Sequence, residues 1–245
     1  MSDVLISNLP TQSPESAAAA ARFWTGGGSI WGVEPKWTSA NSILVSSGSA
    51  LIPEPGFIVN VDQPISQSGL SLPPSSFRHL YLTPDPNIEI STTEPIHYFG
   101  NTWIKGNDNS RRYLGSLLTD ENSALIRFRQ DNGIVRYIPT PDPQRAPFQV
   151  LSAKNTIAET RIDLSHVVPV TAIEATATLH MGNNETDVMM TIGALSGTQW
   201  ASVISPSGTN QIQIPLVARE LFASLNKTPA YGGGNVYITG YRLSR

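Results

Sequence analysis

The sequence contains no cysteine among its 245 residues. Disulfide bonds, thiolate metal sites and cysteine nucleophiles are therefore all excluded. Histidine is scarce, and its four copies lie too far apart for the ligand spacing of zinc motifs or for an HExxH pair. We interpret the histidines as packing or surface residues rather than metal ligands: His79, His97, His166 and His180.

Charge is sparse as well. Charged residues make up 14% of the chain, against about 25% in average proteins. The net charge is -3, which gives no electrostatic basis for binding nucleic acid. Ser, Thr, Asn, Gly and Pro take the place of charged residues. This composition favours β-sheets with many turns and surfaces that meet other chains.

Long apolar runs are missing too. Nothing approaches the roughly 20 apolar residues of a transmembrane helix, so we expect no membrane insertion. Residues 1–10 lack the basic region and apolar core of a signal peptide. We therefore expect synthesis in the cytoplasm and, for any protein found outside a cell, release by another route, such as inside a particle freed by lysis.

Residues 1–42 form an N-terminal anchor segment in our interpretation. Ser13-Pro14-Glu15 is typical of a helix start, and the alanines at 17–21 favour a helix of about ten residues. Isolated helices of this length are marginal in water, so this one needs a partner surface, either on its own domain or on a neighbouring subunit. The aromatic residues of the segment either fill the core of the domain or become buried against partners, and in the second case they are the candidate assembly contacts: Phe23, Trp24, Trp31 and Trp37.

Residues 43–138 predict a small β-domain of short strands separated by turn residues. Asp131-Asn132-Gly133 is the strongest hairpin signal in the chain, between a strand over 124–130 and a return strand over 134–138. The other predicted strands are short and apolar: 43–45, 50–52, 57–61, 79–82 and 112–118.

Residues 139–147 are a proline-rich linker, and residues 148–245 predict a β-sandwich. Ile173, Ala175, Ala177, Leu179 and Met181 alternate with polar residues, as in a half-buried antiparallel strand. About seven such strands fit a jelly-roll-like antiparallel sandwich. Residues 219–224 are expected to be a short helical turn or irregular. The predicted fold class is all-β, with two β-domains and a short N-terminal helix.

Motifs of enzyme chemistry are missing from the sequence. It has no phosphate-binding glycine loop and no GxSxG nucleophile elbow. Asn107-Asp108-Asn109 lacks the glycine and terminal glutamate of a calcium loop, so we expect a surface turn. Carboxylates that folding brings together remain candidates for glycoside cleavage, although they lie mostly in turns, where acids usually cap backbone groups: Asp85, Glu89, Glu94, Asp120 and Glu121. We expect no catalytic residue, no metal and no cofactor.

One further group of aromatic residues lies on a Gly/Asn-rich loop. Tyr98, Phe99 and Trp103 are close in sequence, and their rings are of the kind that stack on sugars. We regard them as candidate glycan contacts.

Eight short motifs resemble, in their order and spacing, a module common in tailed-phage virion proteins. The resemblance covers roughly residues 23–165 and the closing strand. The motifs are Trp24–Gly26, Val45–Pro53, Ser68–Leu72, His79–Leu82, Arg111–Asp120, Ile126–Gln130, Val135–Tyr137 and Val236–Tyr241.

The resemblance implies a structural protein of the virion (synthesised in the host cytoplasm) with no catalytic residues, and it leaves the location on the particle open. Together with the low-charge, turn-rich composition, it leads us to expect a non-enzymatic tail fibre, spike or baseplate component of an adsorption appendage. A capsid decoration protein and a glycan-binding or glycan-cleaving virion enzyme are the alternatives. The expected partners are other tail, baseplate or capsid proteins, further copies of the chain in a homo-oligomer such as a trimer, and a host surface glycan. Nucleic acid is not an expected partner.

Overall fold

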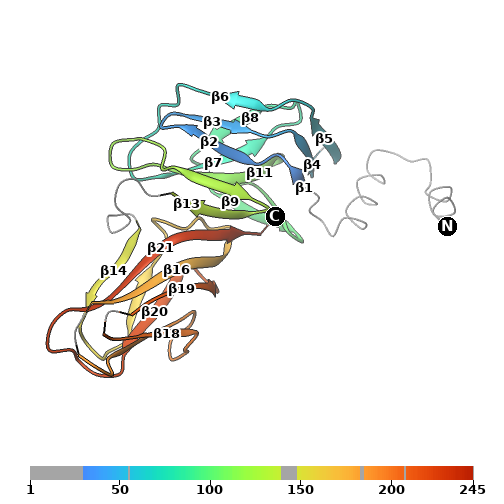
Figure 1. Cartoon of the computed structure of the whole chain (residues 1–245). Coiled ribbons are helices and arrows are strands. Elements are labelled where there is room, and N and C mark those ends of the chain that lie inside the picture. Colours follow the sequence, from blue (N-terminus) through green and yellow to red (C-terminus); the bar gives the residue numbers. More distant parts are fainter. Residues whose placement is uncertain (1–29, 55, 139–147, 183–184, 207, 245) are drawn as a thin grey trace, which may run out of the picture.

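The computed structural model describes residues 30–54, 56–138, 148–182, 185–206 and 208–244. Within these ranges the chain is all-β, contains no helix, and pairs its strands antiparallel throughout (Figure 1). The predicted all-β class is confirmed. The predicted N-terminal helix lies outside the described residues.

Three antiparallel sheets make up the first half of the chain. A three-stranded sheet has the order β1-β4-β5, a second has the order β2-β3-β6, and a five-stranded sheet has the order β8-β7-β11-β10-β9. Their strands are β1 (Ile30–Gly32), β2 (Pro35–Ser39), β3 (Ser42–Val45), β4 (Gly48–Ile52), β5 (Phe57–Val61), β6 (Ile65–Gln67), β7 (Phe77–Leu82), β8 (Ile88–Ser91), β9 (Pro95–Phe99), β10 (Thr102–Lys105) and β11 (Asp108–Leu118).

Two larger sheets follow. A sheet with the order β12-β13-β21-β16-β19 also pairs β14 with β21, and a four-stranded sheet has the order β15-β20-β17-β18. Their strands are β12 (Phe128–Asp131), β13 (Ile134–Tyr137), β14 (Gln149–Lys154), β15 (Thr160–Asp163), β16 (Ala172–Gly182), β17 (Met189–Gly193), β18 (Ala201–Ile204), β19 (Thr209–Pro215), β20 (Glu220–Leu225) and β21 (Gly233–Leu243).

The predicted anchor segment and linker can now be placed. The described part of the anchor segment, residues 30–42, contains β1 and β2, which pair with β4 and β3. The proline-rich residues 139–147 lie outside the described ranges. The hairpin β12–β13 precedes them, yet β13 is hydrogen-bonded to β21 near the end of the chain. One sheet therefore crosses the position at which the sequence places the domain boundary, and the division into domains stays a prediction.

Alternating burial along β16 shows how the second half makes its core. Ala175, Ala177, Leu179 and Met181 are all fully buried, whereas Ile173, at the start of the same face, is exposed. The four buried side chains join one apolar cluster that runs through both halves of the chain. Burial of such side chains stabilises the fold by roughly 25 cal/mol per Å² of apolar area.

The two halves are joined by buried tyrosines. The Tyr113 hydroxyl on β11 lies 2.7 Å from the Ser116 hydroxyl and 2.9 Å from the Thr171 hydroxyl, which precedes β16. The Tyr241 hydroxyl on β21 donates to the Ser116 carbonyl at 3.5 Å, and its ring meets that of Tyr137 with centroids 5.8 Å apart. Hydrogen bonds between groups shielded from water favour one fixed arrangement of the two halves.

One prediction of local structure is wrong. Residues 219–224 were expected to be a helical turn or irregular, but Glu220–Leu225 is strand β20, at the centre of the four-stranded sheet. Its Leu221, Ala223 and Leu225 are buried. Leucine, alanine and glutamate favour helices locally, and pairing with β15 and β17 overrides that preference.

Candidate binding and assembly surfaces

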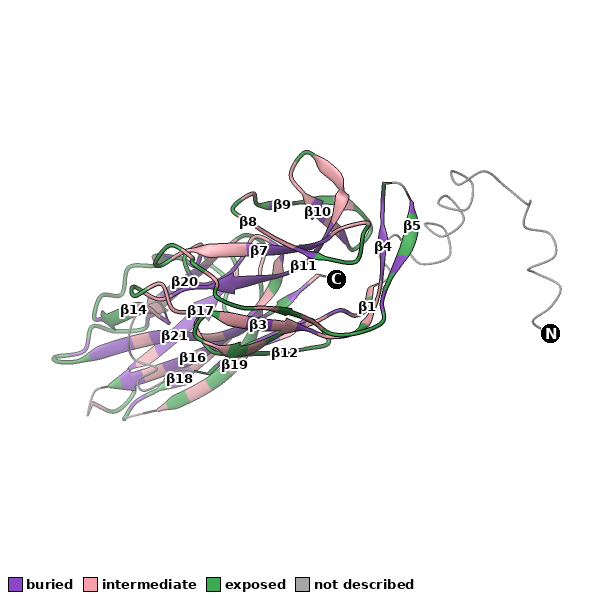
Figure 2. Cartoon of the chain, turned by 90° about the horizontal axis from the view of Figure 1, so that it is seen from above, coloured by how far each residue is buried: buried purple, intermediate pink, exposed green. Residues whose placement is uncertain are grey.

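The side chain of Trp31 is the most exposed large apolar group of the described residues, at 81%. On the sheet β1-β4-β5, Trp31 pairs with Ser49, and Ser49 pairs with Asn60. Cross-strand partners point to the same face, so this face also carries Ile58, two residues before Asn60 and itself 52% exposed. The opposite face carries the buried Ala50 and Val59. Figure 2 shows exposed residues on β5, at the end of the first half where β1 begins.

Trp37, the second described member of the predicted assembly contacts, is held by its own fold. It is half-buried on β2, and its indole N–H donates to the Leu125 carbonyl at 3.2 Å. The Arg127 guanidinium lies over its ring, 5.3 Å from the centroid, in a cation–π contact. Phe23 and Trp24 lie outside the described residues. Of the two predicted contacts that the structure describes, Trp31 is therefore the more exposed.

The candidate glycan contacts lie on the hairpin of β9 and β10. Phe99 is exposed, whereas Tyr98 and Trp103 are half-buried. The Trp103 ring meets His97 edge to face, with centroids 5.5 Å apart, and His97 in turn contacts the Gly100 carbonyl through Nε2 at 2.7 Å. The ring neighbour of Trp103 in the described structure is thus a histidine of the adjacent strand, and the glycan role of the three aromatics stays a prediction.

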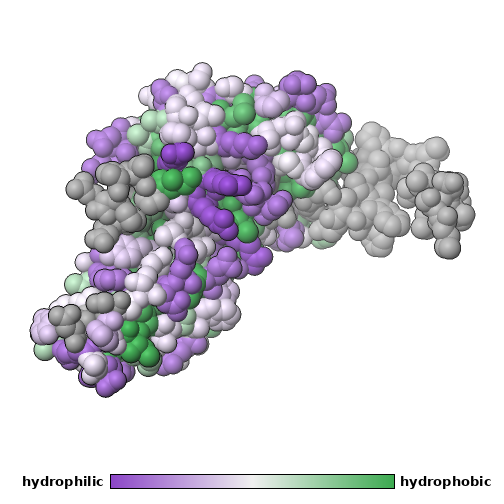
Figure 3. Space-filling model, in the orientation of Figure 1, coloured by the Kyte–Doolittle hydropathy of each residue, from purple (hydrophilic) through white to green (hydrophobic). Residues whose placement is uncertain are grey.

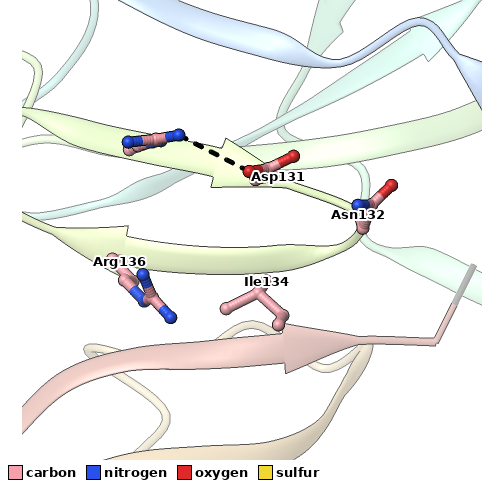
Figure 4. Close-up of a pocket in the computed structure, with 5 residues that line it drawn as sticks. Asp131, Asn132, Ile134 and Arg136 are labelled. Carbon is pink, nitrogen blue, oxygen red and sulfur yellow. Dashed lines mark ion pairs between the residues drawn. The ribbon is translucent and has the colours of Figure 1, made fainter.

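Two shallow hollows flank the hairpin β12–β13. The first, of about 130 Å³, is lined by the exposed face of the hairpin: Arg129, Asp131, Asn132, Ile134 and Arg136. Figure 4 shows Arg136 and Ile134 on the same side of β13, with Asn132 at the turn. The turn follows from the sequence, because Asn132 and Gly133 have φ values of 50° and 77°, as a two-residue type I′ hairpin requires.

The second hollow, of about 360 Å³, lies where β2 and the edge strand β12 face each other. It is lined by Glu34, Lys36, Trp37, Phe128, Arg129, Gln130 and Asp131. Arg129 and Asp131 line both hollows, so the two adjoin at the edge strand β12 and together make one hollowed region. We call it the β12 groove.

Cations outnumber anions around the β12 groove. Lys36, Arg129 and Arg136 line it, against the carboxylates of Glu34 and Asp131. Figure 3 shows strongly hydrophilic residues gathered at the middle of this face of the molecule, beside the C-terminal end of the chain. This local excess of positive charge contrasts with the net charge of -3 for the whole chain.

The sequence predictions did not include this group, although the sequence carries a signal for it. A two-residue turn at Asn132-Gly133 pairs Asp131 with Ile134, and the ladder then places Arg129 opposite Arg136. The hairpin prediction alone therefore fixes the arginine pair.

The candidate carboxylates have structural partners. Glu89 receives hydrogen bonds from Lys105 at 2.5 Å and Arg111 at 2.7 Å. Partial burial alone would raise the pKa of Glu89, but these two cations lower it below its ordinary value. Asp120 accepts backbone hydrogen bonds from residues 122 and 124, as a loop cap does.

The remaining acids are spread over the first half of the chain. Glu94 lies 3.7 Å from Arg219, and Asp85 and Glu121 are exposed. Asp108, expected in a surface turn, begins β11 directly after a turn and accepts two hydrogen bonds from Ser110. Neither hollow contains any of these acids.

Within the described ranges, no group of three or more His, Asp or Glu side chains is arranged to hold a metal ion. The same ranges contain no helix that is long and apolar enough to cross a membrane.

His79 is the histidine most deeply placed in the fold. It lies on β7 with 3% of its surface exposed, and Nδ1 is 2.8 Å from the Ser116 hydroxyl. Burial lowers the pKa of His79 to about 4, and the positive charges of Arg78 and Arg219 add to this effect. The imidazole is therefore a neutral hydrogen-bonding member of the core near pH 7.

Comparison with known proteins adds no relative to this description. No protein-family model matches the chain, and no curated protein matches it.

Proposed function

We propose that the chain is a non-enzymatic structural protein of a tailed-phage virion, a component of a tail fibre, spike or baseplate. The order and spacing of its motifs support this role through their resemblance to tailed-phage virion proteins. In addition, the exposed face that carries Trp31 and Ile58 lies directly after the N-terminal residues 1–29. That face is the observation on which the proposal depends.

Attachment on this face would occur by burial of apolar surface. An aromatic side chain buries about 150–250 Å² at an interface, and Trp31 has 81% of its surface still to bury. At about 25 cal/mol per Å², desolvation of Trp31 contributes about 4 kcal/mol before the costs of association. A partner that also covers Ile58 gains more, so the face is a strong anchor for a neighbouring virion protein.

The second half of the chain would face outward. We infer that the sheet containing β16 and the sheet containing β20 form an antiparallel, jelly-roll-like sandwich, because buried residues of both strands belong to one apolar cluster. A homo-oligomer, in particular a trimer, is the expected form in a fibre, since fibres commonly have cyclic symmetry.

Labelling of particles tests the location. Antibody against the chain, coupled to gold, should mark the tail or its appendages in electron micrographs of purified particles. Mass spectrometry should count tens of copies per particle or fewer. Hundreds of copies on the head would favour capsid decoration, the alternative that shares the fold, and particles that lack the chain would contradict both.

A glycan-binding or glycan-cleaving role is the third candidate. The exposed Phe99 ring favours a sugar contact, whereas Glu89 and Glu94 are each engaged in an ion pair, which favours a structural role for these two acids. Release of reducing sugar from host surface glycans would favour the enzyme.

A further inference from the structure

Three arginines share one face of three neighbouring strands. Arg129 on β12 pairs with Arg136 on β13, and Ile134 on β13 pairs with Arg242 on β21. Because Ile134 and Arg136 are two residues apart on one strand, all three guanidinium groups lie on the same side of the sheet. The chain has 16 basic residues in 245, so three on adjacent strands are a local concentration of positive charge.

These arginines differ in how far they are already paired. Arg242 lies 2.9 Å from Glu174. Arg129 lies 3.5 Å from Asp131, and both of these side chains are mostly exposed, so their attraction is weak. Arg136 has neither an ion pair nor a side-chain hydrogen bond to any residue that the structure describes. Arg136 and Arg129 are therefore available to an outside anion.

The shape of the β12 groove narrows the class of anion. Both hollows of the β12 groove are open to solvent: Arg136 lines the first, Trp37 and Lys36 line the second, and Arg129 lines both. An enclosed cavity suits a small molecule, whereas an open groove suits an extended chain. Guanidinium groups match carboxylates in a bidentate geometry, and an indole offers an apolar surface to a sugar ring.

We propose that the β12 groove binds an acidic polysaccharide, with carboxylates of neighbouring sugars on Arg136 and Arg129 and a sugar ring beside Trp37. The proposal adds a binding site to the structural role and does not depend on that role. A single exposed ion pair contributes little, so a monosaccharide should bind weakly, and a polymer should bind more tightly through repeated contacts.

Binding of defined polymers to the full chain tests the proposal. Polygalacturonate is the probe. Dextran is the control polysaccharide without charge, and polyphosphate is the control polyanion without sugar rings. In biolayer interferometry we expect binding to polygalacturonate that weakens as salt is raised, and none to dextran. The double variant Arg129→Gln/Arg136→Gln should lose at least about ten-fold in affinity, in line with two lost charge-assisted contacts.

Arg161→Gln supplies the matched control. Arg161 is an exposed arginine paired with Glu220 on β20, away from the groove, and its removal changes the net charge by one unit. Its affinity for polygalacturonate should be unchanged. The variants at 129 and 136 alter exposed side chains, and the single variant Arg136→Gln removes a group with no side-chain partner among the described residues, so thermal unfolding should stay the same.

Several outcomes would overturn the proposal. If wild-type protein does not bind polygalacturonate, or if the double variant binds it with wild-type affinity, the β12 groove is not the binding site. An equal loss in Arg161→Gln shows a general charge effect. Polyphosphate bound as tightly as polygalacturonate shows an anion site without sugar recognition. None of these results bears on whether the chain is part of a virion.

Discussion

Acidification should destabilise the protein through His79, in a pH range above that of ordinary carboxylates. The imidazole is buried on β7 beside the Ser116 hydroxyl, with the cations Arg78 and Arg219 acting against a second proton. Its pKa is about 4 in the folded chain and 6.5 in the unfolded chain. Between these values the unfolded state binds a proton that the folded state does not. The stabilising effect is therefore complete above pH 6.5 and is lost as the pH falls towards 4.

The magnitude follows from linkage. With a folded pKa of about 4 and an unfolded pKa of 6.5, the free energy of unfolding should fall by about 1.8 kcal/mol between pH 7 and pH 5. For a chain of this size that corresponds to a decrease of about 4–7 °C in Tm. The pKa of Glu89 is lowered in the folded state, so ionised Glu89 stabilises the fold above the ordinary pKa of a glutamate. That stabilisation is lost as the pH falls below this value, and Glu89 therefore contributes little to the change between pH 7 and pH 5.

Urea unfolding at a series of pH values measures this effect. The variant His79→Asn removes the titrating group. Between pH 7 and pH 5, the decrease in its free energy of unfolding should therefore be about 1.8 kcal/mol smaller than the decrease measured for wild type. Parallel profiles for wild type and His79→Asn would refute the reasoning, as would an NMR titration of His79 with a midpoint near 6.5.

Two further substitutions test the packing between strands and halves. Tyr113→Phe removes the hydroxyl that contacts Thr171 at 2.9 Å and should lower the free energy of unfolding by about 1–2 kcal/mol; an unchanged urea midpoint would show that this link does not stabilise the fold. Gly240→Ala places a Cβ 2.3 Å from the Val135 carbonyl and should cost about 2 kcal/mol or more in thermal unfolding. Gly69→Ala has nothing within 4 Å of the added Cβ and pays only for the φ of 67° at Gly69, so it should cost about 1 kcal/mol or less, and equal losses would contradict the steric account.

The hairpin at Asn132-Gly133 shows how far sequence alone can reach. Its turn residues determine the two-residue loop, and the loop determines that Arg129 faces Arg136. The strand before the turn was expected over 124–130 but begins only at Phe128. Leu125 instead donates its backbone N–H to the Ala40 carbonyl and bridges to Thr119, contacts that no local pattern indicates.

Strand partners were the part that the sequence could not supply. The strands over 43–45 and 50–52 were predicted, yet β3 pairs with β2 and β6 whereas β4 pairs with β1 and β5. Gly48 lies at this transition with φ at 154°, and a Cβ there would meet the Trp31 carbonyl at 2.2 Å. The close approach of β1 and β4 depends on long-range packing, which short-period patterns do not encode.

The candidate surfaces were predicted to a similar extent. Trp31 and Trp37 were grouped because both are aromatic, and the sequence could not show that Trp37 is held by Leu125 and Arg127 while Trp31 is exposed. The two tryptophans lie on strands of different sheets. Their exposure depends on how each sheet packs in the folded chain, which the sequence does not show.

Incorporation into particles tests most directly whether the chain works through contact on the face of β1. Particles would be assembled in a host that supplies wild type, Trp31→Ser or the control Tyr231→Ser, another exposed aromatic in the second half of the chain. Purified particles should contain wild type and the control in equal amounts and should lack Trp31→Ser, whose thermal unfolding is unchanged. Incorporation of Trp31→Ser at the wild-type level, or particles without the wild-type chain, would contradict the account.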